Sequence, residues 1–224
     1  MMETTRRGSA VKIGAAVLAL AVSASAVLAV PLAQAAPARP GKPQPITTTT
    51  QSGATVLTLD DSTAAEWARV GVRLAPRAPA TMKGDAVSLP IRDASADRVL
   101  HAGGLVVVGP RGGKVPADGL VLKVGPGEQS ATLTFTLLGQ RTDLLRSGPV
   151  TTTATPPRVS TRGRTTTTVR TTTLKGTVRL VDDPALILTL NGAIGAYALQ
   201  PGQSIGTFTT TIIDTTTVVK PKPN

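Results

Sequence analysis

The chain contains no cysteine and very few aromatic side chains. Its 224 residues include one tryptophan, one tyrosine, two phenylalanines and one histidine. Without cysteine there can be no disulfide, no lipoprotein anchor, no thiol nucleophile and no thiolate metal site. The few rings cannot both fill a core and form the aromatic platform of a carbohydrate-binding surface. With a single histidine and no G-x-S-x-G turn, the sequence favours a protein that is not an enzyme.

The N-terminus has the pattern of a secretory signal. An apolar stretch, 13–30, is followed by Ala33-Gln34-Ala35, the small-x-small pattern that signal peptidases recognise. Three basic residues stand ahead of it, namely Arg6, Arg7 and Lys12. An apolar run of this length could also remain as an uncut membrane anchor. We favour a cleaved signal helix over 1–35, a transient encounter with the membrane, and a product that is secreted or associated with the cell wall.

Composition divides the rest of the chain into three parts. Residues 36–54 are rich in proline, alanine and threonine without apolar periodicity, which predicts a linker. Residues 55–214 hold the apolar and alternating runs of one β-rich domain, and their number suits a single domain. The last residues, 215–224, predict a flexible tail.

Short apolar or alternating runs predict β-strands through the middle of the chain. They occupy 86–91, 99–108, 120–124 and 131–138. Turn clusters rich in glycine and proline separate them, as at 109–113 and 125–127. A further turn at 200–203 would send 196–199 back as 205–213. Strands at this spacing, with no long helical pattern among them, predict a mainly β fold, sandwich- or barrel-like with antiparallel sheets.

Two stretches share one pattern: an apolar run, paired aspartates, a few helical turns, a glycine, a second apolar run and a proline. They span Val56–Pro76 and Val178–Pro201. We expect a short helix in each. Gly71 would end the first, and Asp183 would cap the second with Pro184 at its first position. Residues 186–190 could equally form a strand, and the repeat favours the helix.

The paired aspartates allow two interpretations. Asp60–Asp61 and Asp182–Asp183 could be glycosidase carboxylates or calcium ligands. Capping and the helix dipole explain their position more simply. Thr63 and Glu66 also have the spacing of a capping box. No further oxygen ligands follow at alternating positions, so we predict no catalytic residue and no metal site, with an undetected hydrolase as an alternative.

A segment rich in threonine and arginine, 147–177, stands apart. From Thr151 to Thr177, 13 of 27 residues are threonine, and 144–181 has seven basic residues and no acidic one. It could be a patch for anionic wall polymers, lipid headgroups or nucleic acid. The other interpretation is a long exposed loop or hairpin whose threonines face water. The candidate contacts with an anionic surface are Arg158, Arg162, Arg164, Arg170 and Lys175. Nucleic acid is not expected, because the protein would be exported and the segment has no aromatic residue for base stacking.

Two motifs resemble a known family. The stretch His101-Ala-Gly-Gly-Leu-Val-Val107 resembles the H-x-G-x-L motif of HtaA-type domains, exported actinobacterial β-rich modules associated with haem uptake. Asn191–Gly202 is similar to the segment near their end, where a tyrosine precedes a turn. Gly71–Ala80, Leu89-Pro90-Ile91 and His101–Leu105 are also similar to a looser group of secreted actinobacterial proteins of unknown function.

The resemblance implies a secreted β-domain with haem as a possible cofactor. HtaA-type domains use an early tyrosine as iron ligand, assisted by a histidine. This chain has no early tyrosine, so His101 and Tyr197 are the candidate ligand-binding residues. From the residues themselves, an ordinary hydrogen bond at a strand edge explains His101 more simply than iron ligation does. Packing of the ring, with its hydroxyl hydrogen-bonded, likewise explains Tyr197 more simply.

Three functions follow as expectations. The first is an exported, non-enzymatic binding or structural module of the cell envelope or extracellular space, without a cofactor, whose partner is an anionic cell-wall polymer or another envelope protein. The second is haem binding or relay through His101 and Tyr197. The third is an undetected hydrolase.

Overall fold

A computed structural model describes residues 44–95, 97–125 and 130–222, which belong to one compact unit. The predicted signal peptide 1–35 and the first part of the predicted linker lie outside these residues. Neither helix within the described ranges has the length and hydrophobicity of a membrane span.

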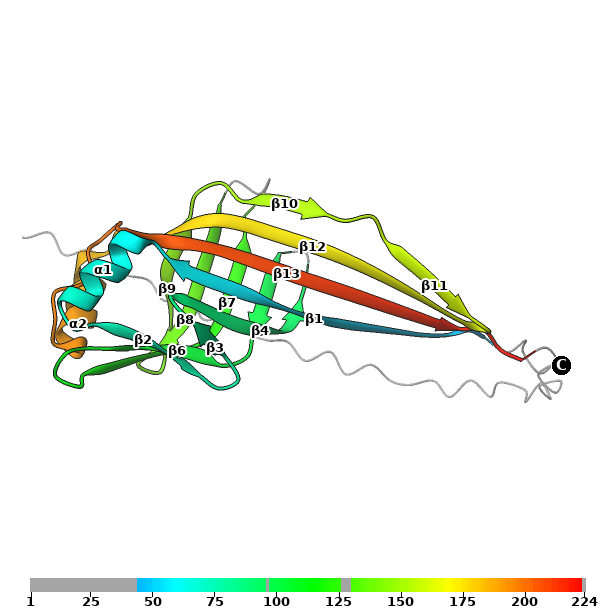
Figure 1. Ribbon diagram of the computed structural model, residues 1–224, viewed down its shortest axis with the longest axis horizontal. Helices are drawn as coiled ribbons and strands as arrows, with labels where there is room; N and C mark the ends of the chain where they lie inside the picture. Colours follow the sequence, from blue (N-terminus) through cyan, green and yellow to red (C-terminus); the bar gives the residue numbers. More distant parts are fainter. Residues whose placement is uncertain (1–43, 96, 126–129, 223–224) are drawn as a thin grey trace, which may run out of the picture. The chain divides into compact units, whose positions relative to one another are not determined.

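The core of the fold is a closed barrel of eight antiparallel strands (Figure 1). In order around the barrel these are β7 (Lys114–Val124), β5 (Arg98–His101), β4 (Ala86–Ala94), β1 (Ile46–Leu59), β13 (Ser204–Val219), β12 (Thr165–Leu180), β9 (Gln140–Ser147) and β8 (Ala131–Leu137). The pairing of β8 with β7 closes the ring. The prediction of a mainly β fold is confirmed, and of its two forms the structure has the barrel.

Five further strands attach to the barrel. They are β2 (Arg73–Arg77), β3 (Thr81–Lys83), β6 (Gly104–Val108), β10 (Thr151–Ala154) and β11 (Arg158–Arg162). β6 joins β7 and carries β2, β3 pairs with β4, and β10 and β11 pair with β12. The single strand predicted over 99–108 is two strands, because Gly103 takes a left-handed conformation, φ 77°, and turns the chain between β5 and β6.

Two helices, α1 (Asp61–Arg69) and α2 (Pro184–Ile194), follow β1 and β12 (Figure 1). Asp183 caps α2 as predicted, since its carboxylate accepts hydrogen bonds from the N–H groups of Ala185 and Leu186 at 3.1 and 3.0 Å. The left-handed Gly71 and Gly195 follow the two helices, also as predicted.

The predicted capping box of α1 is wrong. Its N-cap residue is Asp60, whose side chain makes no capping hydrogen bond. Thr63 is buried and donates to the carbonyl oxygen of Ser204 at 3.3 Å. The Thr63 hydroxyl therefore makes a tertiary contact with the start of β13 instead of capping α1. Sequence spacing within the helix cannot predict such a contact.

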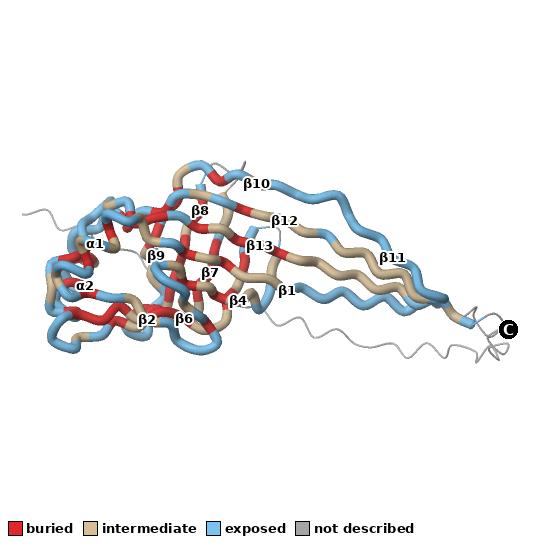
Figure 2. Tube along the Cα trace, in the orientation of Figure 1, coloured by how far each residue is buried: buried red, intermediate tan, exposed pale blue. Residues whose placement is uncertain are grey.

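Three barrel strands continue beyond the barrel as an extension (Figures 1 and 2). β13 pairs with β1 from Ile46↔Val219 onward and with β12 from Thr165↔Val219 onward. The linker predicted to reach residue 54 is therefore strand from Ile46, the loop predicted at 147–177 is mostly β10, β11 and β12, and the tail predicted from 215 is strand to Val219. Threonine favours extended backbone, and each segment finds a strand partner remote in sequence.

The hydrophobic core fills the barrel from the helices to its middle. Phe135, Leu133 and Leu122 are fully buried between the barrel walls. At one end Trp67 of α1 and Ile194 of α2 close the barrel over this core. The extension begins at the opposite end, so the two ends of the barrel differ in what covers them.

Candidate functional site

His101 lies inside the barrel, 3% exposed, and both of its ring nitrogens are hydrogen-bonded. Nδ1 lies 3.1 Å from the carbonyl oxygen of Leu120, and Nε2 lies 2.6 Å from Oγ1 of Thr55. Thr55 Oγ1 is in turn 2.6 Å from Oγ1 of Thr210. A chain of hydrogen bonds thus joins β13, β1, β5 and β7 through the barrel interior.

The directions of these hydrogen bonds follow from chemistry. A carbonyl oxygen can only accept, so Nδ1 of His101 carries the proton and Nε2 of the neutral ring accepts from Thr55. Thr210 then donates to Thr55. Burial lowers the pKa of His101 from 6.5 to about 4, although its hydrogen bond to Leu120 acts in the opposite direction. The ring is therefore neutral at physiological pH and has a structural hydrogen-bonding role.

Tyr197 lies in a different environment. It is 85% exposed on the loop between α2 and β13, whereas His101 is enclosed by the barrel. The structure does not bring these two predicted residues together, and the nitrogens of His101 are engaged within the core. The two side chains do not fit a common iron site, because one would have to leave its hydrogen bonds and the other would have to enter the barrel.

The pairing of Thr55 with His101 resembles a nucleophile with its base, but it is placed where no substrate can reach it. Thr55 is 0% exposed, and the remaining hydrogen bond of His101 goes to a backbone carbonyl instead of a carboxylate. In the described ranges, no group of three acidic or histidine side chains could hold a metal ion.

A small cavity lies under the helices. It has a volume of about 60 Å³ and an almost wholly apolar lining, including Trp67, Phe135 and Ile194. Dry cavities that bind a small aromatic molecule are about 150 Å³. This cavity is therefore a packing void of the core and too small to be a ligand site.

The opposite end of the barrel opens into a much larger pocket, which we call the mouth. Its volume is about 930 Å³, near the upper end of the range for small-molecule sites. Its walls come from the β4–β5 hairpin, the end of β7, and the inner face of the extension. The larger apolar side chains of its lining are Val99, Val124, Leu174 and Ile212. Three of these, all except Val124, belong to the buried core, so the mouth reaches the barrel interior.

Polar and charged side chains surround this apolar floor. Two aspartates of the mouth are already hydrogen-bonded to neutral side chains: Asp97 accepts from Ser95 at 2.9 Å, and Asp214 accepts from Gln51 at 3.0 Å. Arg98 and Arg170 also line the mouth, and neither forms an ion pair with a described carboxylate. Guanidinium groups in this position can bind a carboxylate, sulfonate or phosphate.

One polar atom of the mouth has no partner. Oγ1 of Thr152 is buried and makes no hydrogen bond to any described residue, and Thr152 lines the mouth. Buried hydroxyls are nearly always hydrogen-bonded to protein, water or ligand. The atom has almost no surface accessible to solvent, so it is an unsatisfied group within the wall of the mouth.

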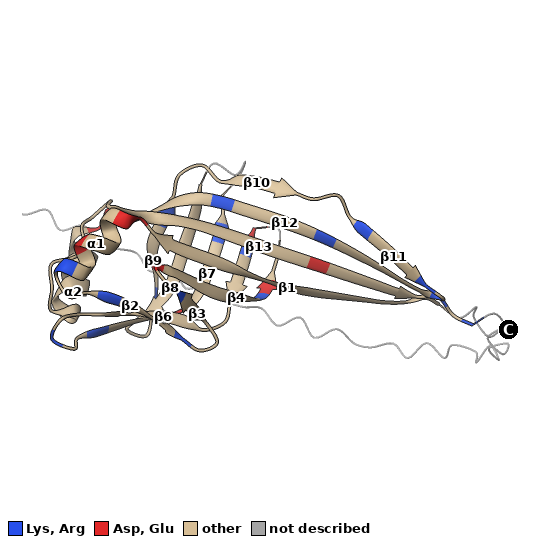
Figure 3. Cartoon of the chain, in the orientation of Figure 1, with Lys and Arg blue, Asp and Glu red and all other residues tan. Residues whose placement is uncertain are grey.

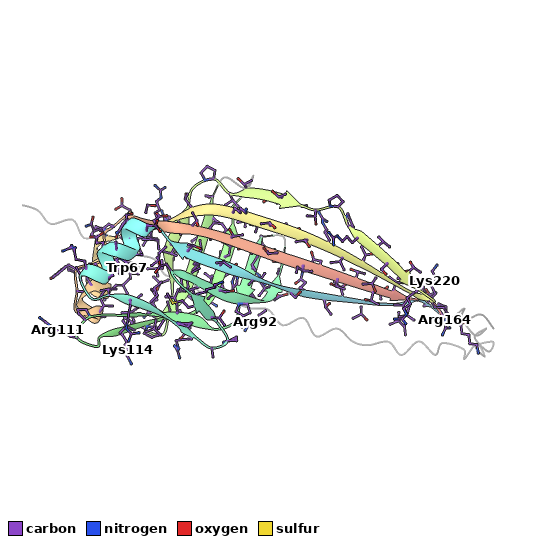
Figure 4. The ribbon with its side chains drawn as sticks, viewed as in Figure 1. Trp67, Arg92, Arg111, Lys114, Arg164 and Lys220 are labelled. Atoms are coloured by element: carbon purple, nitrogen blue, oxygen red, sulfur yellow. The ribbon has the colours of Figure 1, made fainter. Side chains whose placement is uncertain are left out.

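The five predicted anionic-surface contacts are all exposed, but they do not form one patch (Figure 3). Arg170 points into the mouth, so Lys175, five residues along the same strand, points to the opposite face. Arg158 and Arg162 are paired with Val169 and Thr165 and share the face of Lys175. Arg164 lies at the far end of the extension with Lys220 (Figure 4).

Sequence reasoning found Arg170 but not the mouth itself. Gln51, Arg170 and Asp214 lie on three strands far apart in sequence, and they share one face because Gln51 pairs with Asp214 and Arg170 also pairs with Asp214. Strand geometry places every second residue of each run on that face, but the threonine-rich runs show no apolar alternation that would identify it. Which face would line a pocket depends on the barrel.

No family model matches the sequence, and no curated protein matches it. Among solved structures, the chain is similar to the haem-binding protein HtaB from Corynebacterium glutamicum, with 10% sequence identity and a TM-score of 0.45. The match covers 79% of this chain and 100% of that chain. This is a weak and distant resemblance of the Hta type, and no function is carried over from it. Secretion and an actinobacterial origin stay predictions.

Proposed function

We propose that this protein is an exported, non-enzymatic binding module that holds an amphipathic small molecule in the mouth of its barrel. The observation that carries the proposal is the mouth itself, about 930 Å³, with an apolar floor inside the barrel and charged groups around it. Binding sites of this kind combine an apolar lining with a few polar groups that fix orientation.

The mouth favours a ligand with an apolar body and an acidic group. Burying the body against Leu174 and Ile212 contributes roughly 25 cal/mol for each Å² removed from water. Arg98 and Arg170 supply donors for the acidic group, while the two aspartates are already engaged by neutral partners.

Export and the location of the module rest on the sequence. The basic residues, apolar stretch and Ala33-Gln34-Ala35 pattern at the N-terminus support a secreted or cell wall-associated protein. The exposed cations Arg158, Arg162 and Lys175 on one face support a salt-sensitive contact with an anionic wall polymer or another envelope protein.

The mouth can be tested with 1-anilinonaphthalene-8-sulfonate, a probe that has an apolar body and one sulfonate. We expect saturable binding to the purified protein, weakened at least about tenfold by Thr172→Phe, since Thr172 lines the mouth and the larger ring would occupy it. Thr173→Phe is the matched control, because the neighbouring residue points to the opposite face. Isothermal titration calorimetry of the three proteins measures this. Equal affinity in all three, or no binding by the unmodified protein, would overturn the proposal.

Haemin provides a second prediction. Because His101 is held in the core and Tyr197 is on the surface, any Soret band that haemin shows with this protein should be the same in the His101→Gln/Tyr197→Phe double variant. Absorption titrations of both proteins, each shown to be folded by circular dichroism, measure this. A Soret shift that disappears in the folded double variant would restore the haem hypothesis.

A further inference from the structure

The first half of β1 has an open edge. From Ile46 to Gly53 the strand pairs with β13 on one side, while β4 pairs only with Ala54–Thr58 on the other. Among the residues that the structure describes, no strand pairs with the second side of Ile46–Gly53, which we call the free edge. In Figure 1 it forms one margin of the extension, and β11 forms the other.

The backbone groups that face outward can be assigned. The N–H of Leu59 donates to Asp85 at 3.1 Å, on the β4 side of the strand. N–H and C=O directions alternate along a strand, and the pairing of β1 with β13 has no register shift. The N–H groups of Thr47, Thr49 and Gln51 therefore point toward the free edge, and those of Thr48 and Thr50 point toward β13.

Two other edges of the same sheet are protected in the ways that usually prevent pairing between molecules. β2 carries Arg73, Arg77 and a proline between them. β11 follows two prolines, is five residues long, and carries an arginine at each end (Figure 3). The free edge of β1 is Ile-Thr-Thr-Thr-Thr-Gln-Ser-Gly, with no charge and no proline.

We propose that the free edge pairs antiparallel with the same edge of a second copy of this chain. An uncharged strand of repeated threonines is complementary to itself. With Thr48 opposite its own copy, Thr47 of one chain faces Thr49 of the other, and their outward groups form about four backbone hydrogen bonds. Thr–Thr pairs across strands already occur here, as between Thr49 and Thr216, whose hydroxyls are 3.4 Å apart. The two copies are related by a two-fold axis, and each uses the same edge. Their pairing therefore leaves no free edge for a third copy and gives a dimer instead of a fibre.

The net charge of the chain predicts how the dimer should respond to salt. The net charge is +11 at pH 7, so two copies repel each other while their pairing strands are neutral. Screening by salt should therefore strengthen the dimer. A contact between the free edge and an acidic partner would instead weaken as salt is added.

Sedimentation velocity over a concentration series tests the pairing. We expect the unmodified protein to dimerise and Thr49→Pro to weaken the dimer roughly tenfold or more, because it removes an outward N–H and blocks close approach. Thr49→Val is the matched control, which keeps the N–H and should still dimerise. Since the N–H of Thr49 is not bonded to β13, Thr49→Pro should keep the barrel, which circular dichroism can check.

A second variant keeps the test decisive if the proline disturbs the strand. Thr48→Lys retains every backbone group but places two ammonium groups close together across the two-fold axis. We expect a loss of dimer at low salt and a partial recovery at high salt. A monomeric unmodified protein at all concentrations, or a dimer that survives both Thr49→Pro and Thr48→Lys, would overturn the proposal and leave the free edge for a different partner.

Discussion

Lowering the pH from 7 to 5 should destabilise this protein by about 2 kcal/mol through His101 alone, and His101→Gln should remove that part of the pH dependence. The pKa of His101 is about 4 in the folded protein because the ring is buried, and 6.5 when it is exposed by unfolding. Below pH 6.5 the unfolded chain therefore binds a proton that the folded chain does not. Stability falls as the pH falls from about 6.5 to about 4, and this contribution is constant above and below that window.

Urea unfolding at pH 7 and pH 5, followed by circular dichroism, measures the effect. The control is Thr55→Val, which removes the hydroxyl that donates to Nε2 but leaves the ring able to take up a proton. This variant should be less stable at both pH values, by about 1 to 3 kcal/mol, because His101 and Thr210 lose a buried partner. It should keep a pH dependence. If His101→Gln shows the full pH dependence of the unmodified protein, the buried ring is not its source.

Local signals in the sequence predicted the local parts of the fold. The cap by Asp183 and the glycines after both helices involve groups within a few residues of one another, so their spacing is enough to identify them. The valine- and leucine-rich strands were visible because one or both faces are buried. Thr63 shows the limit of this reasoning, since its hydroxyl bonds to Ser204, 141 residues away.

The extension and the mouth could not be predicted, because both depend on pairing between remote segments. Ile46 pairs with Val219, which lies near the other end of the chain. The threonine-rich runs of β1, β12 and β13 that form the extension lack the apolar alternation that marks a half-buried strand. Such runs have the same composition as linkers and exposed loops. The environment of His101 could not be predicted for the same reason. Its hydrogen-bond partners, Thr55 and Leu120, are remote in sequence and are brought to the two nitrogens of the ring only by the barrel.

Asn191→Ala should cost about 3 to 5 kcal/mol of folding stability. The residue is buried, and its amide Nδ2 donates to the carbonyl oxygen of Leu199 at 2.8 Å. Its Oδ1 accepts from the N–H groups of Ala198 and Leu199 at 3.2 and 3.0 Å. Ala198 and Leu199 are buried as well, so water cannot replace these bonds, and each orphaned group costs roughly 1 to 3 kcal/mol.

This side chain also explains why 196–199 is not the strand predicted from the sequence. The backbone groups that would form a ladder are satisfied by Asn191, and the carbonyl oxygen of Ala198 accepts from the indole N–H of Trp67 at 3.1 Å. The loop thus ties α2 to α1 over the closed end of the barrel. Loss of Asn191 should expose Trp67 to solvent before the barrel itself unfolds, which would shift tryptophan fluorescence to the red.

Thermal and urea unfolding of Asn191→Ala should be compared with Thr189→Ala on the same helix. Thr189 is exposed and its hydroxyl bonds only to the carbonyl of Ala185, one turn earlier, at 2.9 Å, so its loss should change stability by less than about 0.5 kcal/mol. Both variants gain the same helix-favouring alanine, which leaves the buried hydrogen bonds as the difference between them. Equal stabilities for the two variants would mean that water reaches the loop and that Asn191 does not hold the closed end together.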